Sequence, residues 1–191
     1  MTSILTSLGR TVLAGFILLV LIIFALGGNF SSAELPFVFR WLHVMFGVMW
    51  IGLLWYFNFV QIPSMPKIPD EQKPAVSKVI APTALFWFRY AALFTVVTGL
   101  LLAGANGYLV QALTLQRPVL AIGIGMWLAI VMAFNVWFII WPNQKKALGI
   151  VQVEAAEKAA AARLAMLTSR FNTMFSIPML YMMVAQQNGG L

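Results

Sequence analysis

The chain's single histidine, His43, lies in a long apolar stretch at residues 40–61. Gly47 and Trp50 follow it four and seven residues later, so the three residues share one face of a helix. A neutral imidazole can bind haem iron, and a glycine one turn away lets a flat ligand or another backbone approach the ring. A histidine that lies at a membrane interface and is hydrogen-bonded to a neighbour or to water would explain the same sequence pattern. The spacing makes His43, Gly47 and Trp50 candidate cofactor-binding residues and leaves both interpretations open.

A second group of polar side chains lies toward one end of the apolar segments. It consists of Asn58, Arg89, Asn135, Asn143, Arg170 and Asn172. Polar groups inside a membrane are costly and often functional. If they converge at one depth, Arg89 or Arg170 would pair with an anionic ligand, and the amides would bind an amide-rich one. Hydrogen bonds between helices, with arginines that extend to the membrane surface, explain the same pattern, and the sequence favours that explanation.

Composition sets the class of protein. Hydrophobic residues make up 62% of the 191 residues and charged residues 9%, whereas a soluble domain carries about 25% charge. The net charge of +7 is explained by cytoplasmic loops rich in Lys and Arg, so no nucleic-acid partner is inferred. The absence of cysteine excludes disulfides, iron–sulfur clusters, thiolate zinc sites and covalently attached haem. No carboxylate lies in an apolar segment, and no metal site is predicted.

The apolar segments predict an all-α membrane bundle in one domain, residues 1–191, with about five transmembrane helices. Pro142 is expected to end the fourth span. An alanine-rich stretch with scattered charges predicts a surface helix on the cytoplasmic side at residues 151–168. The five spans are expected at residues 11–28, 40–61, 84–104, 118–141 and 171–187.

The distribution of basic residues predicts the orientation. A cytoplasmic N-terminus places nine lysines and arginines on the cytoplasmic side and leaves Arg40 and Arg117 outside. Such a bias is typical of multi-pass proteins of the bacterial inner membrane. It predicts a periplasmic C-terminus and places His43 near the outer surface. The small residues Gly123 and Gly125 predict close helix packing in the fourth span.

Four segments carry a family resemblance. They read RWLHVMFGVMWIGLLWYFNF at 40–59, WFRYAALFTVVTGLLL at 87–102, NVWFIIWPNQKKALG at 135–149 and SRFNTMFSIPMLYMM at 169–183. Together they resemble the membrane domain of bacterial cytochrome-c-linked urate oxidases, the urate oxidase N-terminal domain. A more distant similarity is to membrane protoporphyrinogen oxidases and copper-resistance membrane proteins, which share the WLH…W helix. This similarity implies haem b held by His43.

Two functions follow from the resemblance. Further histidines of the family pattern correspond here to Phe171 and to Gln186 or Gln187. A chain that keeps the family fold but lacks these histidines favours a non-catalytic accessory subunit of a larger bacterial bioenergetic complex. That complex would be respiratory, photosynthetic or a monooxygenase. The alternative is a haem b-binding redox protein, an oxidoreductase that passes electrons to a periplasmic cytochrome c. A transporter is least favoured, because no internal symmetry is evident.

Overall fold

The computed structural model describes residues 2–28 and 34–188, and all regular elements in these ranges are helical. By its internal contacts the chain divides into Met1–Leu35 and Pro36–Leu191. The first unit contains α1 (Thr2–Leu5) and α2 (Leu8–Ala25). Almost every residue of α2 is apolar and none is buried. This is the pattern of a helix that lipid can surround, and α2 is long enough to cross a bilayer.

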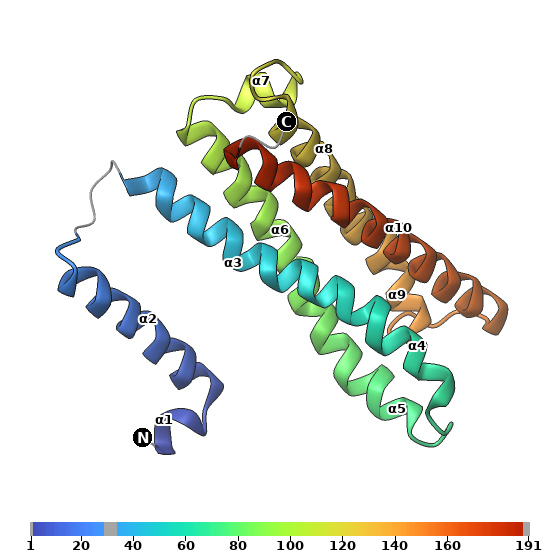
Figure 1. The fold of residues 1–191 in the computed structure, drawn as a ribbon. Helices are drawn as coiled ribbons and strands as arrows, with labels where there is room; N and C mark the ends of the chain where they lie inside the picture. Colours follow the sequence, from blue (N-terminus) through green and yellow to red (C-terminus); the bar gives the residue numbers. More distant parts are fainter. Residues whose placement is uncertain (1, 29–33, 189–191) are drawn as a thin grey trace. The chain divides into compact units, whose positions relative to one another are not determined.

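The second unit is a bundle of long helices joined by short turns (Figure 1). Short π-helical and 3₁₀ segments, labelled η, continue several of the α-helices without a break. The elements are α3 (Leu35–Trp55), η2 (Tyr56–Gln61), α4 (Ile62–Ser64), η3 (Met65–Lys67), α5 (Lys73–Ala75), η4 (Val76–Ile80), α6 (Ala81–Ala105), α7 (Leu109–Leu113), α8 (Leu120–Phe134), η5 (Asn135–Ile140), α9 (Trp141–Ala147) and α10 (Ala155–Asn188).

The three π-helical segments have a common cause in the sequence. Each ends two residues before a proline: Pro63 after η2, Pro82 after η4 and Pro142 after η5. Proline lacks an N–H, and its ring collides with the carbonyl four residues earlier, so a wider turn lets the helix continue. The expectation that Pro142 ends a span is therefore wrong, because the helix continues through α9 to Ala147.

Among residues 2–28 and 34–188, four helices are long and apolar enough to cross a membrane. These are Leu8–Ala25, Leu35–Lys67, Lys73–Ala105 and Leu120–Ala147. They correspond to the first four expected spans, although the last three extend further than expected. The expected surface helix at 151–168, from residue 155 on, and the expected fifth span at 171–187 form one continuous helix, α10 (Ala155–Asn188), whereas residues 151–154 are not helical. The two halves differ in polarity, which suggested a boundary, but no break in the backbone accompanies that change.

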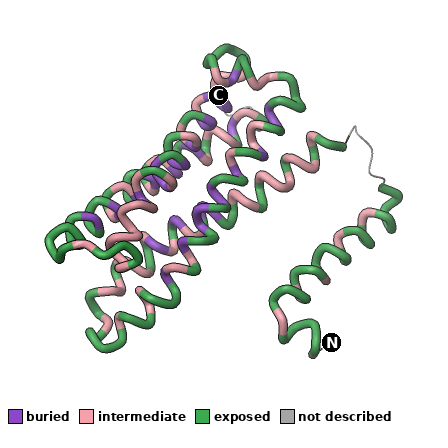
Figure 2. Tube along the Cα trace, turned by 180° about the vertical axis from the view of Figure 1, so that it is seen from behind, coloured by how far each residue is buried: buried purple, intermediate pink, exposed green. Residues whose placement is uncertain are grey.

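Within the second unit, α10 packs along α8, η5 and α9 (Figure 1). Buried residues follow the inner faces of these helices (Figure 2). The core centres on large side chains from three helices, Trp50, Phe88 and Met132. The expected close packing at the two glycines is confirmed: a Cβ on Gly123 would overlap the Ala112 carbonyl of α7, and one on Gly125 would lie 3.2 Å from Met182 Cβ.

Candidate functional site

A cavity of about 590 Å³ lies among α3, α6, α8 and α10 of the second unit. This volume is in the range of small-molecule and cofactor pockets. Its walls are mostly apolar, and they include His43, Gly47 and Trp50. The structure therefore brings all three predicted cofactor-binding residues to one cavity, as their shared helix face required.

The imidazole of His43 is held by the neighbouring helix. Its Nδ1 atom lies 2.8 Å from the backbone carbonyl oxygen of Thr95 on α6. A carbonyl oxygen only accepts hydrogen bonds, so Nδ1 carries the hydrogen and donates it. Nε2 then holds a lone pair, and within the described part of the chain it makes no hydrogen bond. Histidines that bind metals have this arrangement, with the second nitrogen donating to a carbonyl or carboxylate.

Space for the imidazole comes from Gly99 on α6. A Cβ at this position would lie 2.9 Å from His43 Cε1 and 3.0 Å from Nδ1, closer than real side chains pack. A Cβ on Gly47 would make only an ordinary 3.9 Å contact with Thr95 Cγ2. Gly99 is thus the glycine on which the ring position depends. The sequence does not point to Gly99, because residue spacing within one helix carries no information about the helix opposite.

Trp50, which lines the same cavity, carries an unsatisfied donor. Its side chain is completely buried, and its Nε1 has no hydrogen-bond partner among the described residues. An enclosed N–H without an acceptor costs about 1–3 kcal/mol. Because the Nε1 atom is itself enclosed, this donor is not open to the cavity.

One end of the cavity is polar. Arg40 Nη1 donates a hydrogen bond of 3.0 Å to Gln187 Oε1, and both residues line the cavity together with Tyr108. Burial raises the pKa of the Tyr108 phenol, and the nearby Arg40 guanidinium opposes that rise. Tyr108 therefore stays neutral at physiological pH, and Arg40 is the charged group in the lining.

The predicted polar group divides into separate sets. Asn135 Nδ2 donates to Asn172 Oδ1 at 2.8 Å, and Asn172 Nδ2 donates to the Met132 carbonyl at 2.9 Å. Asn58 Nδ2 donates to Ser169 Oγ at 2.8 Å. These bonds join η2, α8 and η5 to α10, as expected for hydrogen bonding between helices.

Two serines missed by the sequence analysis complete this arrangement. Ser169, Asn172 and Ser176 are all buried on α10, and Trp55 Nε1 donates to Ser176 Oγ at 3.0 Å. Their spacing of three and seven residues places them on one helix face. That spacing is visible in the sequence and would have identified the face that α10 turns toward its neighbours.

The remaining three residues of the predicted group do not join these bonds. Asn143 donates to the Ile139 carbonyl of its own helix, and Arg170 is exposed. Arg89 is buried, and its guanidinium carbon lies 3.4 Å from the ring centroid of Trp141. The six residues therefore do not form one ligand-binding cluster.

Comparison with known proteins finds a family match in the C-terminal part of the chain. Residues 108–189 match the urate oxidase N-terminal family. The match confirms the resemblance expected from the sequence, over a segment that is less than half of the chain. It includes α8 and α10, which form one side of the cavity, whereas His43 lies outside it. No curated protein and no solved structure matches the chain.

Proposed function

We propose that this chain is a membrane electron-transfer subunit whose cavity would hold a haem b-type cofactor, with His43 as the residue that would bind its iron. The observation that carries the proposal is the 2.8 Å contact between His43 Nδ1 and the Thr95 carbonyl. It fixes the imidazole tautomer, so the Nε2 lone pair is available to a metal ion. The sequence alone favoured the accessory role, and the cavity beside His43 reverses that preference.

The residues around the cavity suit such a group. The volume of about 590 Å³ and the small residue Gly47 suit a flat ring system. Arg40 offers a cation for carboxylates at one end. Met126, Met179 and Met183 also line the cavity and offer thioether sulfur as a further ligand. When bound, haem iron supplies one-electron transfer.

Each protein group has a separate task in this proposal. Thr95 orients the imidazole through its carbonyl, and Gly99 leaves room for the ring. The apolar helices exclude water, which governs the redox potential of a buried cofactor. With the N-terminus in the cytoplasm of a bacterium, the Arg40 end of the cavity faces the periplasm. A periplasmic cytochrome c is then the electron acceptor.

An accessory role in a larger respiratory, photosynthetic or monooxygenase complex is the second candidate. It is favoured by α2, an 18-residue helix that is almost entirely apolar and so offers an apolar surface to partner helices as well as to lipid. This candidate predicts co-purification with larger subunits in a fixed ratio. The haem proposal predicts a cofactor spectrum in the isolated chain.

The test is a reduced-minus-oxidised visible spectrum of freshly purified protein. Wild type is expected to show a haem b band, and His43→Ala is expected to lose it. Asn143→Ala serves as the control and should keep the band, because among the described residues Asn143 bonds only to its own helix. If the wild type is helical by circular dichroism but has no band, the haem proposal is wrong and the accessory role is preferred.

A further inference from the structure

Arg89 is a buried cation in an apolar segment. It belongs to the membrane-crossing stretch Lys73–Ala105, and 8% of its surface is exposed. Its Nε and Nη1 atoms are enclosed, and neither has a hydrogen-bond partner among the described residues. The face of Trp141 provides a cation–π contact, with the guanidinium carbon 3.4 Å from the ring centroid. That contact leaves the charge unneutralised, and an isolated buried charge is costly.

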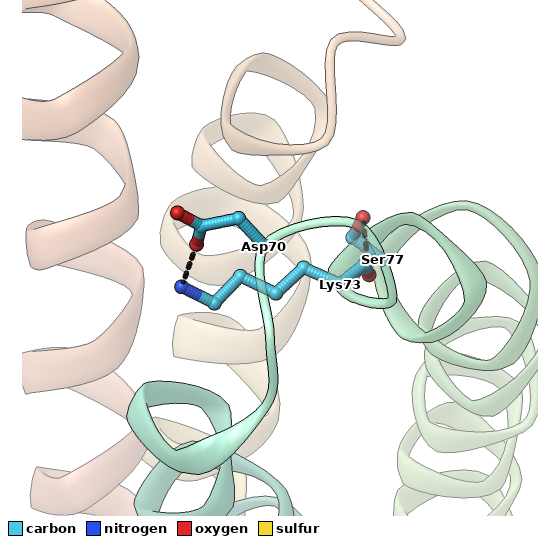
Figure 3. Close-up of polar contacts among 3 residues, drawn as sticks. All are labelled: Asp70, Lys73 and Ser77. Carbon is cyan, nitrogen blue, oxygen red and sulfur yellow. Dashed lines mark hydrogen bonds and ion pairs between the residues drawn. The ribbon is translucent and has the colours of Figure 1, made fainter.

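A second cation lies against the same ring. Lys145 Nζ is 5.7 Å from the centroid of Trp141. The ion pairs found among the described residues use other lysines: Lys146 binds Glu157, and Lys73 binds Asp70 (Figure 3). Within residues 2–28 and 34–188, neither Arg89 nor Lys145 has a carboxylate partner. An anion that neutralises the positive charge around Trp141 would therefore come from outside this chain.

Helix length places this group at the membrane boundary. The 33 residues of Lys73–Ala105 extend about 50 Å at 1.5 Å per residue, and the hydrocarbon layer is about 30 Å thick. The excess is expected at the Lys73 end, next to the charged turn that contains Asp70. Arg89 then lies within about one helical turn of the boundary. Lipid phosphates lie just outside this level, and tryptophans such as Trp141 are enriched there.

The surface beside Arg89 suits acyl chains. Phe86 and Tyr90 are exposed neighbours on α6, and their rings lie 4.7 Å apart. Trp137 extends this aromatic surface from η5: its ring lies 5.7 Å from that of Tyr90, and its Nε1 donates to the Arg89 carbonyl at 3.2 Å. A cationic pair bordered by exposed aromatic rings matches an amphiphile with an anionic head.

We propose that Arg89 and Lys145, which both lie near the ring of Trp141, bind the phosphate of an acidic phospholipid. The phosphate accepts hydrogen bonds from Arg89 Nη2, which is not among the enclosed atoms, and from the Lys145 ammonium. The acyl chains lie along Phe86, Tyr90 and Trp137. The predicted orientation places this end at the cytoplasmic leaflet, which is rich in acidic lipids. The site is separate from the cavity of His43, because neither cation lines that cavity, so it does not rest on the proposed function.

The test measures lipid retention by native mass spectrometry. Protein reconstituted in vesicles of phosphatidylcholine and phosphatidylglycerol is extracted in mild detergent, and the bound lipid is counted. Wild type is expected to retain phosphatidylglycerol in preference to phosphatidylcholine. Arg89→Gln and Lys145→Gln should each lower retention about tenfold, the effect of one charge-assisted hydrogen bond. Arg163→Gln removes one exposed charge from α10 and should retain lipid like wild type.

Three results would overturn the proposal. One is equal retention of phosphatidylglycerol by wild type, both variants and the Arg163→Gln control. Another is equal retention of the two lipids by wild type. The third is displacement of phosphatidylglycerol by millimolar inorganic phosphate, which would assign the two cations to a free anion. If Arg89→Gln does not accumulate, the comparison of Lys145→Gln with the control decides the question.

Discussion

The backbone carbonyl of Thr95 accepts a hydrogen bond from His43 Nδ1 at 2.8 Å and another from Thr98 Oγ1 at 3.2 Å. A helical carbonyl normally bonds along its own helix, and here α6 also uses one to hold a side chain of α3. The contact sets both the position of the ring and the nitrogen that carries its hydrogen. It makes α6 as important to the candidate site as the helix that contributes the histidine.

Gly99→Ala should displace the His43 ring. The added Cβ would lie 2.9 Å from Cε1, so the imidazole must move and its bond to Thr95 weakens. We expect a loss of about 1–3 kcal/mol in the free energy of unfolding, typical of overpacking, and a weaker haem band. Denaturant unfolding in detergent and the visible spectrum measure the two effects.

Gly104→Ala is the matched control on the same helix. No heavy atom lies within 4 Å of its added Cβ. Because alanine is the better helix former, this change should raise stability by up to about 1 kcal/mol. Equal behaviour of the two variants would show that Gly99 does not limit the position of the ring.

The buried pair Asn135–Asn172 should be energetically coupled. Asn172→Leu leaves the Asn135 amide without its acceptor, and Asn135→Leu removes a donor from Asn172. We expect each single variant to lose stability and the double variant to lose less than the sum. A double-mutant cycle should give a coupling energy of about 0.6–1.7 kcal/mol.

Asn143→Leu is the comparison for this pair. Its amide bonds only to the Ile139 carbonyl of its own helix, so coupling with Asn172→Leu should be close to zero. A coupling as large as that of Asn135 would contradict the assignment of Asn172 to the Asn135 pair.

The carboxyl group of Asp70 should titrate at a lower pH than usual because of Lys73 (Figure 3). The hydrogen bond and charge of Lys73 lower the pKa of Asp70 from its ordinary value of 3.8. Lys73→Gln should raise the pKa toward that value. Asp70 is the only aspartate of the chain, so protein labelled with ¹³C-aspartate gives one carboxyl resonance to follow against pH.

The sign of the linkage follows from the lowered pKa. The ion pair favours the folded state above the ordinary pKa, and its contribution is lost as the pH falls through the lowered pKa. Asp70 is exposed and Lys73 is partly exposed, so the effect on stability should be small. Lys67→Gln is the control, and a shift of the Asp70 pKa as large as that in Lys73→Gln would contradict the specific pair.

Local sequence patterns predicted much of the helical framework. Apolar runs indicated the first four helices, and periodicity placed His43, Gly47 and Trp50 on one face, where the structure has them lining one cavity. The same reasoning failed at Pro142, where a wide turn lets the helix continue. The prediction of two elements within α10 was also wrong. The change in polarity along this segment suggested a boundary, but the backbone continues as one helix.

The sequence by itself determined the class of protein, its long apolar helices and the face on which His43 lies, because composition and helical periodicity are local properties. Only the tertiary structure decided which groups meet across helices. Thr95 and Gly99 reach His43, Asn135 meets Asn172, and Arg89 lies against Trp141. These contacts depend on the rotation and crossing of neighbouring helices, which side-chain packing sets over the whole bundle and which no short segment encodes.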